Sequence, residues 1–392
     1  MRLGRLDRLR QGASGNHRID GVKRPALELP WWLPIRNPNT GSRPKRKELA
    51  VNYCGMDIGK KTSHVCILDE QRKIVLERAI ATRPSAILKA LGDLPPMRIA
   101  IEASGRSFWI ADRLEEAGHA VVVVDPGKTK AIGASKIKND RLDARVIASL
   151  NAADLMAPVY RPTAEQRVAR MPVNARGVLV QNRVRSTNCV RGLLASEGIE
   201  VRSCTAKKFA DRVRQMELPP EIAAAVAPLL DAIEAMVASI ESYNASIERR
   251  AKADPVLRRL TTAHGVGAIT ASAFVGTIHD PHRFDNAGQV AAYVGLAPSL
   301  YSSGATHRIG GITKRGNREL RSLLTMAANA MMRGHQESKL RTWALKVAER
   351  QGRKKAVVAL ARRLAGVLWR MWLREEDFRA NPVPRRLKIT IG

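Results

Sequence analysis

Four acidic residues in the first half of the chain have the types and spacing that phosphoryl-transfer chemistry needs. Asp57 and Glu102 each close an apolar run, so both carboxylates fall at the ends of predicted strands. Asp140 and Asp143 are three residues apart, which places both carboxylates on one face of a helix. Carboxylate oxygens suit Mg²⁺, and phosphoryl transfer commonly uses two such ions about 4 Å apart. We therefore predict that these four residues form a magnesium site.

The alternative for these carboxylates is an ordinary structural or surface role. The chain has 36 acidic residues, so some coincidence near strand ends is expected. A carboxylate at the end of a buried strand is nevertheless costly unless a cation or a metal pairs with it. Nearby basic residues either neutralise the carboxylates or guide a phosphate backbone to the metal. These residues are Lys128, Lys130, Lys136, Lys138, Arg141 and Arg145.

A second candidate centre is the segment 301–304, in which two serines, Ser302 and Ser303, precede a glycine. A serine hydroxyl attacks phosphorus when a base or a metal orients or deprotonates it. Ser-Ser-Gly by itself is more typical of a turn. His279 and His282 lack an evident third metal ligand, and we expect a polar loop there.

The composition favours a polyanionic partner. Lys and Arg number 67 against 36 Asp and Glu, which gives a net charge of +31 and a pI near 10.9. Such a charge attracts nucleic acid and makes binding depend strongly on salt. We see no apolar run near the roughly 18 residues of a membrane span, and no signal peptide. The four cysteines show no CxxC or zinc spacing and predict reduced thiols in a cytoplasmic protein.

The elements that must position the four carboxylates are predicted in an α/β domain that follows a disordered leader. Residues 1–48 are rich in Arg, Pro and Gly and predict a disordered basic leader. Residues 50–155 predict an α/β domain with three strands in succession, followed by strands that alternate with helices. That order resembles the ribonuclease H-like fold. The strands are expected at 51–59, 63–68, 73–78, 97–101 and 120–124, and helices near 85–91 and 108–117.

The rest of the chain is predicted to be mostly helical. Residues 163–252 predict a helical arm, because a heptad repeat of apolar residues runs from 222 to 247. A helix near 177–196 pairs with this repeat in an intramolecular hairpin, or the repeat makes a dimer contact; both alternatives stay open. We expect Pro172 to disturb the start of the arm.

The C-terminal part is predicted as a domain over residues 255–335 and a basic helical tail over 336–392. Its first segment, 260–271, has the look of a helix-hairpin-helix, in which Gly265 and Gly267 present backbone N–H groups to phosphate. A helix over 284–296, a polar segment over 299–311 and a helix over 320–332 are expected to follow.

Several blocks of the sequence resemble the DEDD transposases of bacterial insertion sequences of the 110/116/902 type. Gly55–Lys60, Ile101–Gly105 and Lys138–Ala144 are similar to the three acidic blocks of that family. Its C-terminal transposase domain resembles the segments Gly265–Gly267, Ala292–Pro298, Ser303-Gly304 and Thr313–Arg321. The blocks follow in family order over about residues 52–335. Asn139, His264 and Thr313 depart from the residues usual in the family, and none of them is a proposed catalytic residue.

The resemblance implies a transposase that cuts and rejoins DNA by transesterification in the bacterial cytoplasm, on the nucleoid when bound. It implies a RuvC-like N-terminal domain in which Asp57, Glu102, Asp140 and Asp143 bind Mg²⁺, with two ions possible. Ser303 is then the nucleophile, with Ser302 as the fallback. The implied partners are donor and target double-stranded DNA, a structured guide RNA and further copies of the chain in a homodimer or homotetramer. The residues predicted to contact nucleic acid are Lys136, Lys138, Arg141, Gly265, Gly267, Arg308, Lys314, Arg315 and Arg318.

Three other functions fit part of the sequence. A Holliday-junction-resolvase-like nuclease uses the acidic residues alone, and the Ser-Gly block argues against it. A sugar-kinase-like or actin-like ATPase shares Asp-x-Gly after its first strand, but no second phosphate loop is evident. A non-catalytic nucleic-acid-binding protein, with purely structural carboxylates, is the third alternative.

Overall fold

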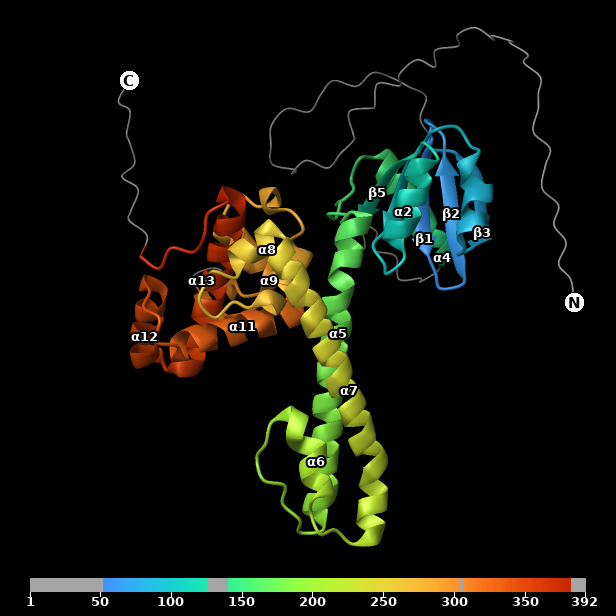
Figure 1. Ribbon diagram of the computed structural model, residues 1–392. Coiled ribbons are helices and arrows are strands. Elements are labelled where there is room, and N and C mark those ends of the chain that lie inside the picture. Colours follow the sequence, from blue (N-terminus) through green and yellow to red (C-terminus); the bar gives the residue numbers. More distant parts are fainter. Residues whose placement is uncertain (1–51, 126–139, 304–305, 382–392) are drawn as a thin grey trace, which may run out of the picture.

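The computed structural model describes residues 52–125, 140–303 and 306–381 (Figure 1). Within these ranges the side chains of Asp140 and of residues 300–309 are outside the description. The predicted leader, Lys136 and Lys138, and the end of the predicted tail also lie outside the described residues.

A five-stranded sheet with the strand order β3-β2-β1-β4-β5 forms one end of the molecule (Figure 1). Strands β1 (Tyr53–Ile58), β2 (Thr62–Leu68) and β3 (Ile74–Ala81) form an antiparallel meander. Strands β4 (Arg98–Glu102) and β5 (Ala120–Val124) continue the sheet in parallel with β1. The expected α/β region with five strands is therefore confirmed, with differences only at strand ends.

The two faces of this sheet carry different helices. One face buries residues such as Met56 and Ile101 against α1 (Pro84–Ile87), a π-helical turn (Leu88–Gly92) and α2 (Ser107–Glu116). The other face carries α4 (Asp140–Ala152), whose buried alanines pack on β1 and β2. Successive residues of a strand point to opposite faces, so each strand contributes to both layers.

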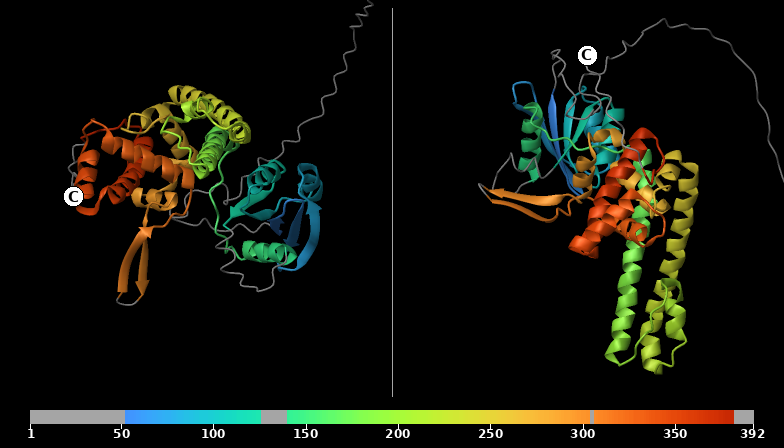
Figure 2. Two further views of the ribbon diagram at one scale, coloured as in Figure 1. Left: turned by 90° about the horizontal axis from the view of Figure 1, so that it is seen from below. Right: turned by 90° about the vertical axis from the view of Figure 1, so that its left-hand side faces the viewer.

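Two long helices form an arm that extends away from the sheet (Figures 1 and 2). Helix α5 (Ala164–Ser196) packs along α7 (Pro220–Ala253), and a 3-10 turn (Ala206–Lys208) and α6 (Phe209–Arg214) complete the tip. The intramolecular hairpin is thus present within one chain. The expected disturbance at Pro172 is wrong, because α5 continues through this residue. Contacts with α7 and α9 on neighbouring turns stabilise the helix despite the hydrogen bond that proline cannot donate.

Helix α7 corrects the expectation that no segment is apolar enough to cross a membrane. By length and composition, α7 alone among the described helices meets that requirement. One such helix is weak support for a membrane span, since helices of soluble proteins pass the same test. Its heptad residues Val226 and Ile233 are buried against α5 and α6, and Ile247 joins the C-terminal core. The apolar repeat therefore has a packing role in this chain.

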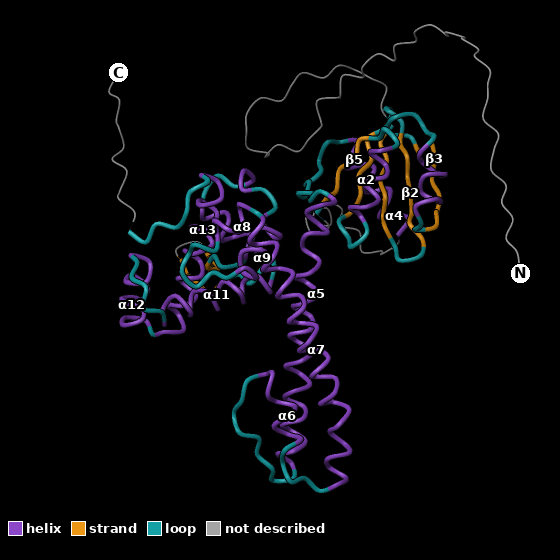
Figure 3. The backbone as a smooth tube through the Cα atoms, viewed as in Figure 1, coloured by secondary structure: helices purple, strands orange, loops and turns teal. Residues whose placement is uncertain are grey.

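The C-terminal part is a helical unit built around one large hydrophobic core. Helices α8 (Pro255–Leu260) and α9 (Ala268–Ile278) flank the predicted glycine turn. A 3-10 turn (Pro281–Arg283), α10 (Ala287–Val294), α11 (Arg318–Arg333), α12 (Lys339–Gln351) and α13 (Arg353–Arg374) follow. Figure 3 shows how helices dominate this half, whereas the large sheet lies at the other end.

Two segments of the C-terminal unit differ from the sequence expectation. The polar segment 299–311 forms a hairpin of β6 (Pro298–Ser303) and β7 (Thr306–Ile312), which projects from the helices (Figure 2). The helix expected over 284–296 begins only at Ala287, because the Asn286 side chain caps it by accepting from the Gln289 amide.

Candidate metal and nucleic-acid site

Two of the predicted metal ligands follow each other's strand register at the carboxyl ends of the neighbouring strands β1 and β4. Strand β1 pairs in parallel with β4, and Met56 is aligned with Ile101. Asp57 and Glu102 are the next residues along the two strands, so they continue the same register. Met56 and Ile101 are buried on the α2 face. Because side chains alternate, Asp57 and Glu102 belong to the opposite face, which α4 covers.

Helix α4 approaches this face closely because residue 55 is a glycine. A Cβ atom at Gly55 would lie 2.3 Å from the Ala144 carbonyl oxygen and 2.3 Å from the Ala148 amide nitrogen. Such distances are far below van der Waals contact, so any side chain at this position would push the helix away.

The direction of α4 follows from the contacts at its far end. Asn151 donates to the carbonyl oxygen of Cys54 at 3.0 Å and of Arg98 at 2.9 Å, at the beginnings of β1 and β4. The helix therefore runs antiparallel to these strands. Its first turn, which contains Asp140 and Asp143, lies toward the strand ends that carry Asp57 and Glu102.

The ligand atoms of the predicted metal site are of the type that a hard divalent cation prefers. Asp57, Glu102 and Asp143 supply carboxylate oxygens, the ligands that Mg²⁺ uses in proteins. Asp140 is the first residue of α4, and its side chain is outside the description. Among the side chains that are described, no three His, Cys, Asp or Glu residues gather closely enough to hold a metal. Asp57, Glu102 and Asp143 are among these side chains, so the structure does not gather the three into a metal site, and the four-residue site stays a prediction.

The two arginines of α4 pair with a carboxylate that the sequence analysis did not single out. Arg141 and Arg145 both donate to Glu77 on β3. These hydrogen bonds lower the pKa of Glu77 from 4.5 to about 2. The signal available in the sequence was a single acidic residue within an apolar strand. The predicted contact between Arg141 and nucleic acid stays a prediction.

The predicted serine centre lies at the end of the projecting hairpin. Ser302 is aligned with His307 and Ser303 with Thr306, so the two serines are the last residues of β6 before the tip. Arg308 lies on β7. Lys314, Arg315 and Arg318 follow at the base of the hairpin and are exposed.

Two glycines and one arginine hold the segments at the base of the hairpin together. Gly295 and Gly316 have φ values of 80° and 79°, a region that favours glycine. A Cβ atom at Gly295 would lie 1.8 Å from the Arg315 carbonyl oxygen, and one at Gly316 would lie 2.2 Å from that of Tyr293. Arg321 donates to the Arg315 carbonyl at 2.7 Å. These contacts fix the direction in which the hairpin leaves the helical unit.

One of the two glycines in the turn between α8 and α9 has a packing role. Gly265 has a φ of 77°, and a Cβ atom there would lie 2.4 Å from the Ala327 carbonyl oxygen of α11. Gly267 is exposed, caps the N-terminus of α9 and would meet nothing within 4 Å. The proposed phosphate contact at this turn stays a prediction.

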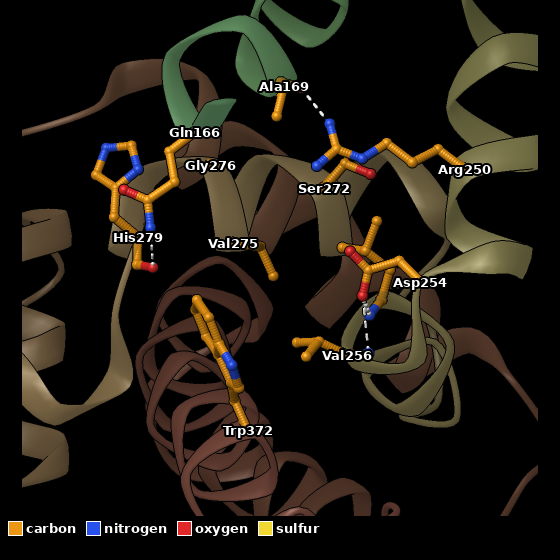
Figure 4. Close-up of a pocket in the computed structure, with 11 residues that line it drawn as sticks. Gln166, Ala169, Arg250, Asp254, Val256, Ser272, Val275, Gly276, His279 and Trp372 are labelled. Carbon is orange, nitrogen blue, oxygen red and sulfur yellow. Dashed lines mark hydrogen bonds between the residues drawn. The ribbon is translucent and has the colours of Figure 1, made fainter. Parts of the chain in front are cut away.

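A cavity of about 210 Å³ lies between α5, α7, α9 and α13 (Figure 4). Its lining includes Gln166, Arg250 and His279, and none of the predicted site residues. The expected loop is present between α9 and α10, but His279 within it is buried, whereas His282 is exposed. Burial and the nearby charges of Arg170 and Arg283 lower the pKa of His279 to about 4. The cavity belongs to the packing of the helical unit.

Comparisons with known proteins cover both halves of the chain. A family model described as "Transposase", for the DEDD type, matches residues 54–198. A second model, described as "Transposase IS116/IS110/IS902 family", matches residues 257–342. The first match spans α4 and the strands that carry Asp57 and Glu102, and the second spans the serine hairpin.

Individual relatives match over most of their length. A protein of Pseudomonas aeruginosa named "Probable family 20 transposase" is 30% identical over 84% of this chain and 99% of its own. The transposase for insertion sequence element IS1111A of Coxiella burnetii is 28% identical over 86% of this chain and 94% of its own. The transposase for IS1328 of Yersinia enterocolitica is 27% identical over 81% and 96%. The chain therefore belongs to the IS116/IS110/IS902 family of transposases, enzymes that cut and rejoin DNA.

Proposed function

We propose that this transposase cuts and rejoins DNA with a divalent metal site and a nucleophilic serine on separate parts of the chain. The proposed metal ligands are Asp57, Glu102, Asp140 and Asp143, and the proposed metal is Mg²⁺, as one ion or two. The observation that carries this proposal is the parallel pairing of β1 with β4, aligned at Met56 and Ile101, because Asp57 and Glu102 follow directly at the strand ends toward which α4 begins. When bound, the metal stabilises negative charge on the reacting phosphate. The sheet and α4 serve to hold the carboxylates in place.

The proposed nucleophile is Ser303, with Ser302 as the fallback. The Ser303 hydroxyl loses its proton and attacks a phosphodiester phosphorus, and the departing strand takes up a proton at the oxygen released. A DNA hydroxyl then attacks the phosphoserine, which restores the serine and joins the new strand. The position of both serines as the last residues of β6, in a hairpin that projects from the helices, supports this role.

We also propose the fold type and the division of the chain. The order of the sheet, with an antiparallel meander followed by parallel strands, supports a ribonuclease H-like, RuvC-like domain over residues 50–155. The helical arm takes residues 163–252, and the serine-bearing domain begins near residue 255. We join α12 and α13 to that domain, since they share its hydrophobic core.

The proposed partners are donor and target double-stranded DNA, a structured guide RNA and further copies of the chain, in the bacterial cytoplasm. The net charge of +31 supports binding to the nucleic acids. The guide RNA and the homodimer or homotetramer follow from the resemblance to the family. Specificity delegated to base pairing would explain why the chain has no evident base-reading motif.

The test is a strand-joining reaction with donor and target DNA, the RNA encoded beside the element, and Mg²⁺. We expect Asp57→Ala to abolish joining while nucleic-acid binding survives. We expect Ser303→Ala to abolish both joining and the covalent serine–DNA adduct, whereas the matched control Ser302→Ala retains both.

Unchanged joining by Ser303→Ala would exclude this serine and favour Ser302 or a nuclease that uses the carboxylates alone. Unchanged joining by Asp57→Ala would exclude the metal site. A wild-type protein that binds nucleic acid but never cuts it would support the non-catalytic alternative.

A further inference from the structure

A row of residues crosses four strands beneath α4. Glu77 on β3 is aligned with Cys66 on β2, Cys66 with Gly55 on β1, and Gly55 with Ala100 on β4. Cys66, Gly55 and Ala100 are small, which leaves room for the backbone of the helix. Glu77, at the edge of the sheet, is the long and charged member of this row.

Glu77 meets two arginines that lie one turn apart on α4. Nε of Arg141 and Nε of Arg145 each donate to a Glu77 oxygen, and Arg145 Nη2 donates to Glu77 Oε2 at 2.8 Å. The Glu77 side chain is 9% exposed, whereas those of Arg141 and Arg145 are 60% and 41% exposed. Hydrogen bonds between charged partners are stronger than neutral ones, and here both carboxylate oxygens are used.

The position of these ion pairs along α4 connects them to the proposed metal ligands. Arg141 directly follows Asp140, and Arg145 is two residues beyond Asp143. Residues four apart lie on the same helix face, so one carboxylate restrains both the rotation and the axial position of the first turns. The other end of α4 is held separately by Asn151.

We propose that Glu77 is a positioning residue, which holds the first turn of α4 where Asp140 and Asp143 join Asp57 and Glu102. This inference rests on the proposed metal site. Glu77 ties the N-terminal turns of α4 to β3 by its ion pairs with Arg141 and Arg145. In this role Glu77 acts through Arg141 and Arg145.

The competing role for the two arginines is contact with a phosphate backbone, and the two roles predict different effects. If the arginines bind phosphate, Glu77→Gln frees two cations and strengthens nucleic-acid binding, whereas Arg145→Gln weakens it. If they position α4, Glu77→Gln and Arg145→Gln act in the same direction on metal binding.

The experiment measures Mn²⁺ binding to the full chain by isothermal titration without nucleic acid, and nucleic-acid binding in EDTA. We compare wild type with Glu77→Gln and Arg145→Gln. The matched control is Glu234→Gln, which removes a carboxylate paired with Arg214 on the distant arm. Thermal unfolding of each variant reports whether it is folded.

We expect both Glu77→Gln and Arg145→Gln to weaken Mn²⁺ binding by about tenfold, the lower end of the loss seen for residues that support metal ligands. Glu234→Gln should keep wild-type affinity. Glu77→Asp, which keeps the charge on a shorter side chain, should recover part of the loss and also serves if Glu77→Gln does not fold.

Wild-type Mn²⁺ affinity in folded Glu77→Gln would overturn the inference and leave the proposed function intact. Opposite changes in nucleic-acid affinity, with Mn²⁺ affinity unchanged, would assign the arginines to phosphate binding. Absence of Mn²⁺ binding by the wild type would overturn the proposed metal site itself, and this inference with it.

Discussion

Gly55 decides how closely helix α4 approaches the sheet. The backbone atoms of Ala144 and Ala148 occupy the space that a side chain at residue 55 would need. These atoms belong to a helix backbone, which cannot yield as the end of a flexible side chain can. The absence of a Cβ atom at residue 55 therefore allows the backbone of α4 to pack directly against β1.

We expect Gly55→Ala to lower the stability of the sheet unit by roughly 1–3 kcal/mol or more, because the helix must shift. The measurement is urea unfolding, with Mn²⁺ titration to follow the site. The control is Gly192→Ala in α5, where a Cβ atom meets nothing within 4 Å. That change should stabilise the helix by roughly 0.5–1 kcal/mol. Equal stability of Gly55→Ala and wild type would show that α4 is free to move.

His279 is a neutral buried histidine, and its surroundings explain why. Its side chain is 8% exposed and its ring stacks on Tyr160 with 5.8 Å between ring centroids. Burial, and after it the charges of Arg170 and Arg283, disfavour a second proton and lower the pKa of His279 from 6.5 to about 4. The unfolded chain therefore binds a proton between these two pH values that the folded chain does not.

It follows that folding stability falls as pH decreases from about 6.5 to about 4, and this contribution is fully lost below that range. His279→Asn removes the titrating group and retains a residue that tolerates the φ of 64°. We expect a flatter dependence of unfolding free energy on pH in the variant. Parallel pH profiles for the two proteins would contradict this explanation.

At the scale of elements, the arm owes its shape to a small hydrophobic core at its tip. Leu194 of α5, Phe209 of α6 and Ile233 of α7 are buried there, and the Arg191 guanidinium lies over the Phe209 ring at 5.0 Å. This core is separate from the cores of the sheet and of the C-terminal unit. The tip of the arm is therefore stabilised locally, whereas Val173 and Ile247 at its base belong to the C-terminal core.

Ile233→Ala should destabilise the tip of the arm by about 2–5 kcal/mol, because it leaves a cavity in this core. Hydrogen exchange should accelerate in α6 and in the adjacent halves of α5 and α7, with little change in α11 and α13. Val184→Ala, at a side chain that is 44% exposed, is the control and should change stability by less than about 0.5 kcal/mol. Uniform acceleration across the chain would mean that the arm and the C-terminal unit unfold together.

At the scale of the whole molecule, the segment before α5 fixes the sheet unit against the helical unit. The Val159 amide donates to the Val123 carbonyl of β5 at 2.9 Å. Arg161 and Arg167 pair with Asp112 of α2. On the other side, Arg283 lies 3.9 Å from the centre of the Tyr160 ring. The relative position of the two proposed centres within one chain therefore depends on this junction.

Gln166 links the start of α5 to the same junction. Its side-chain oxygen accepts from the Thr163 amide at 3.0 Å in a capping box, and its Nε2 donates to the His279 carbonyl at 2.9 Å. Gln166 thus caps the start of α5 together with Thr163 and connects it to the end of α9.

Asp112→Ala should loosen the junction, because it removes the shared acceptor of Arg161 and Arg167. Small-angle scattering should report a larger radius of gyration, and DNA joining should fall more than nucleic-acid binding does. Glu116→Ala on the same helix is the matched control, since Glu116 pairs with Arg113 of α2 itself. An unchanged radius of gyration in Asp112→Ala would show that the remaining contacts suffice to hold the two units.

Local sequence patterns predicted the elements in which apolar residues follow a clear strand or helix period. The run 120–124 is entirely apolar and forms β5 within the expected bounds, and the heptad repeat of α7 is the buried side of the arm. The hairpin of β6 and β7 escaped prediction because its polar residues lack the apolar alternation of a half-buried strand. Pro172 was misjudged because its helix is stabilised by packing that no local preference reports.

The amino-acid sequence alone determined the family, the α/β and helical regions, and the four carboxylates and two serines that are candidates for chemistry. Residue type, spacing and charge are local properties, and all of them can be taken directly from the sequence. Only the tertiary structure decided that Glu77 pairs with Arg141 and Arg145, 64 and 68 residues further on, and that Gly55 admits α4. These contacts depend on strand register and helix approach, which arise when segments far apart in the chain pack together.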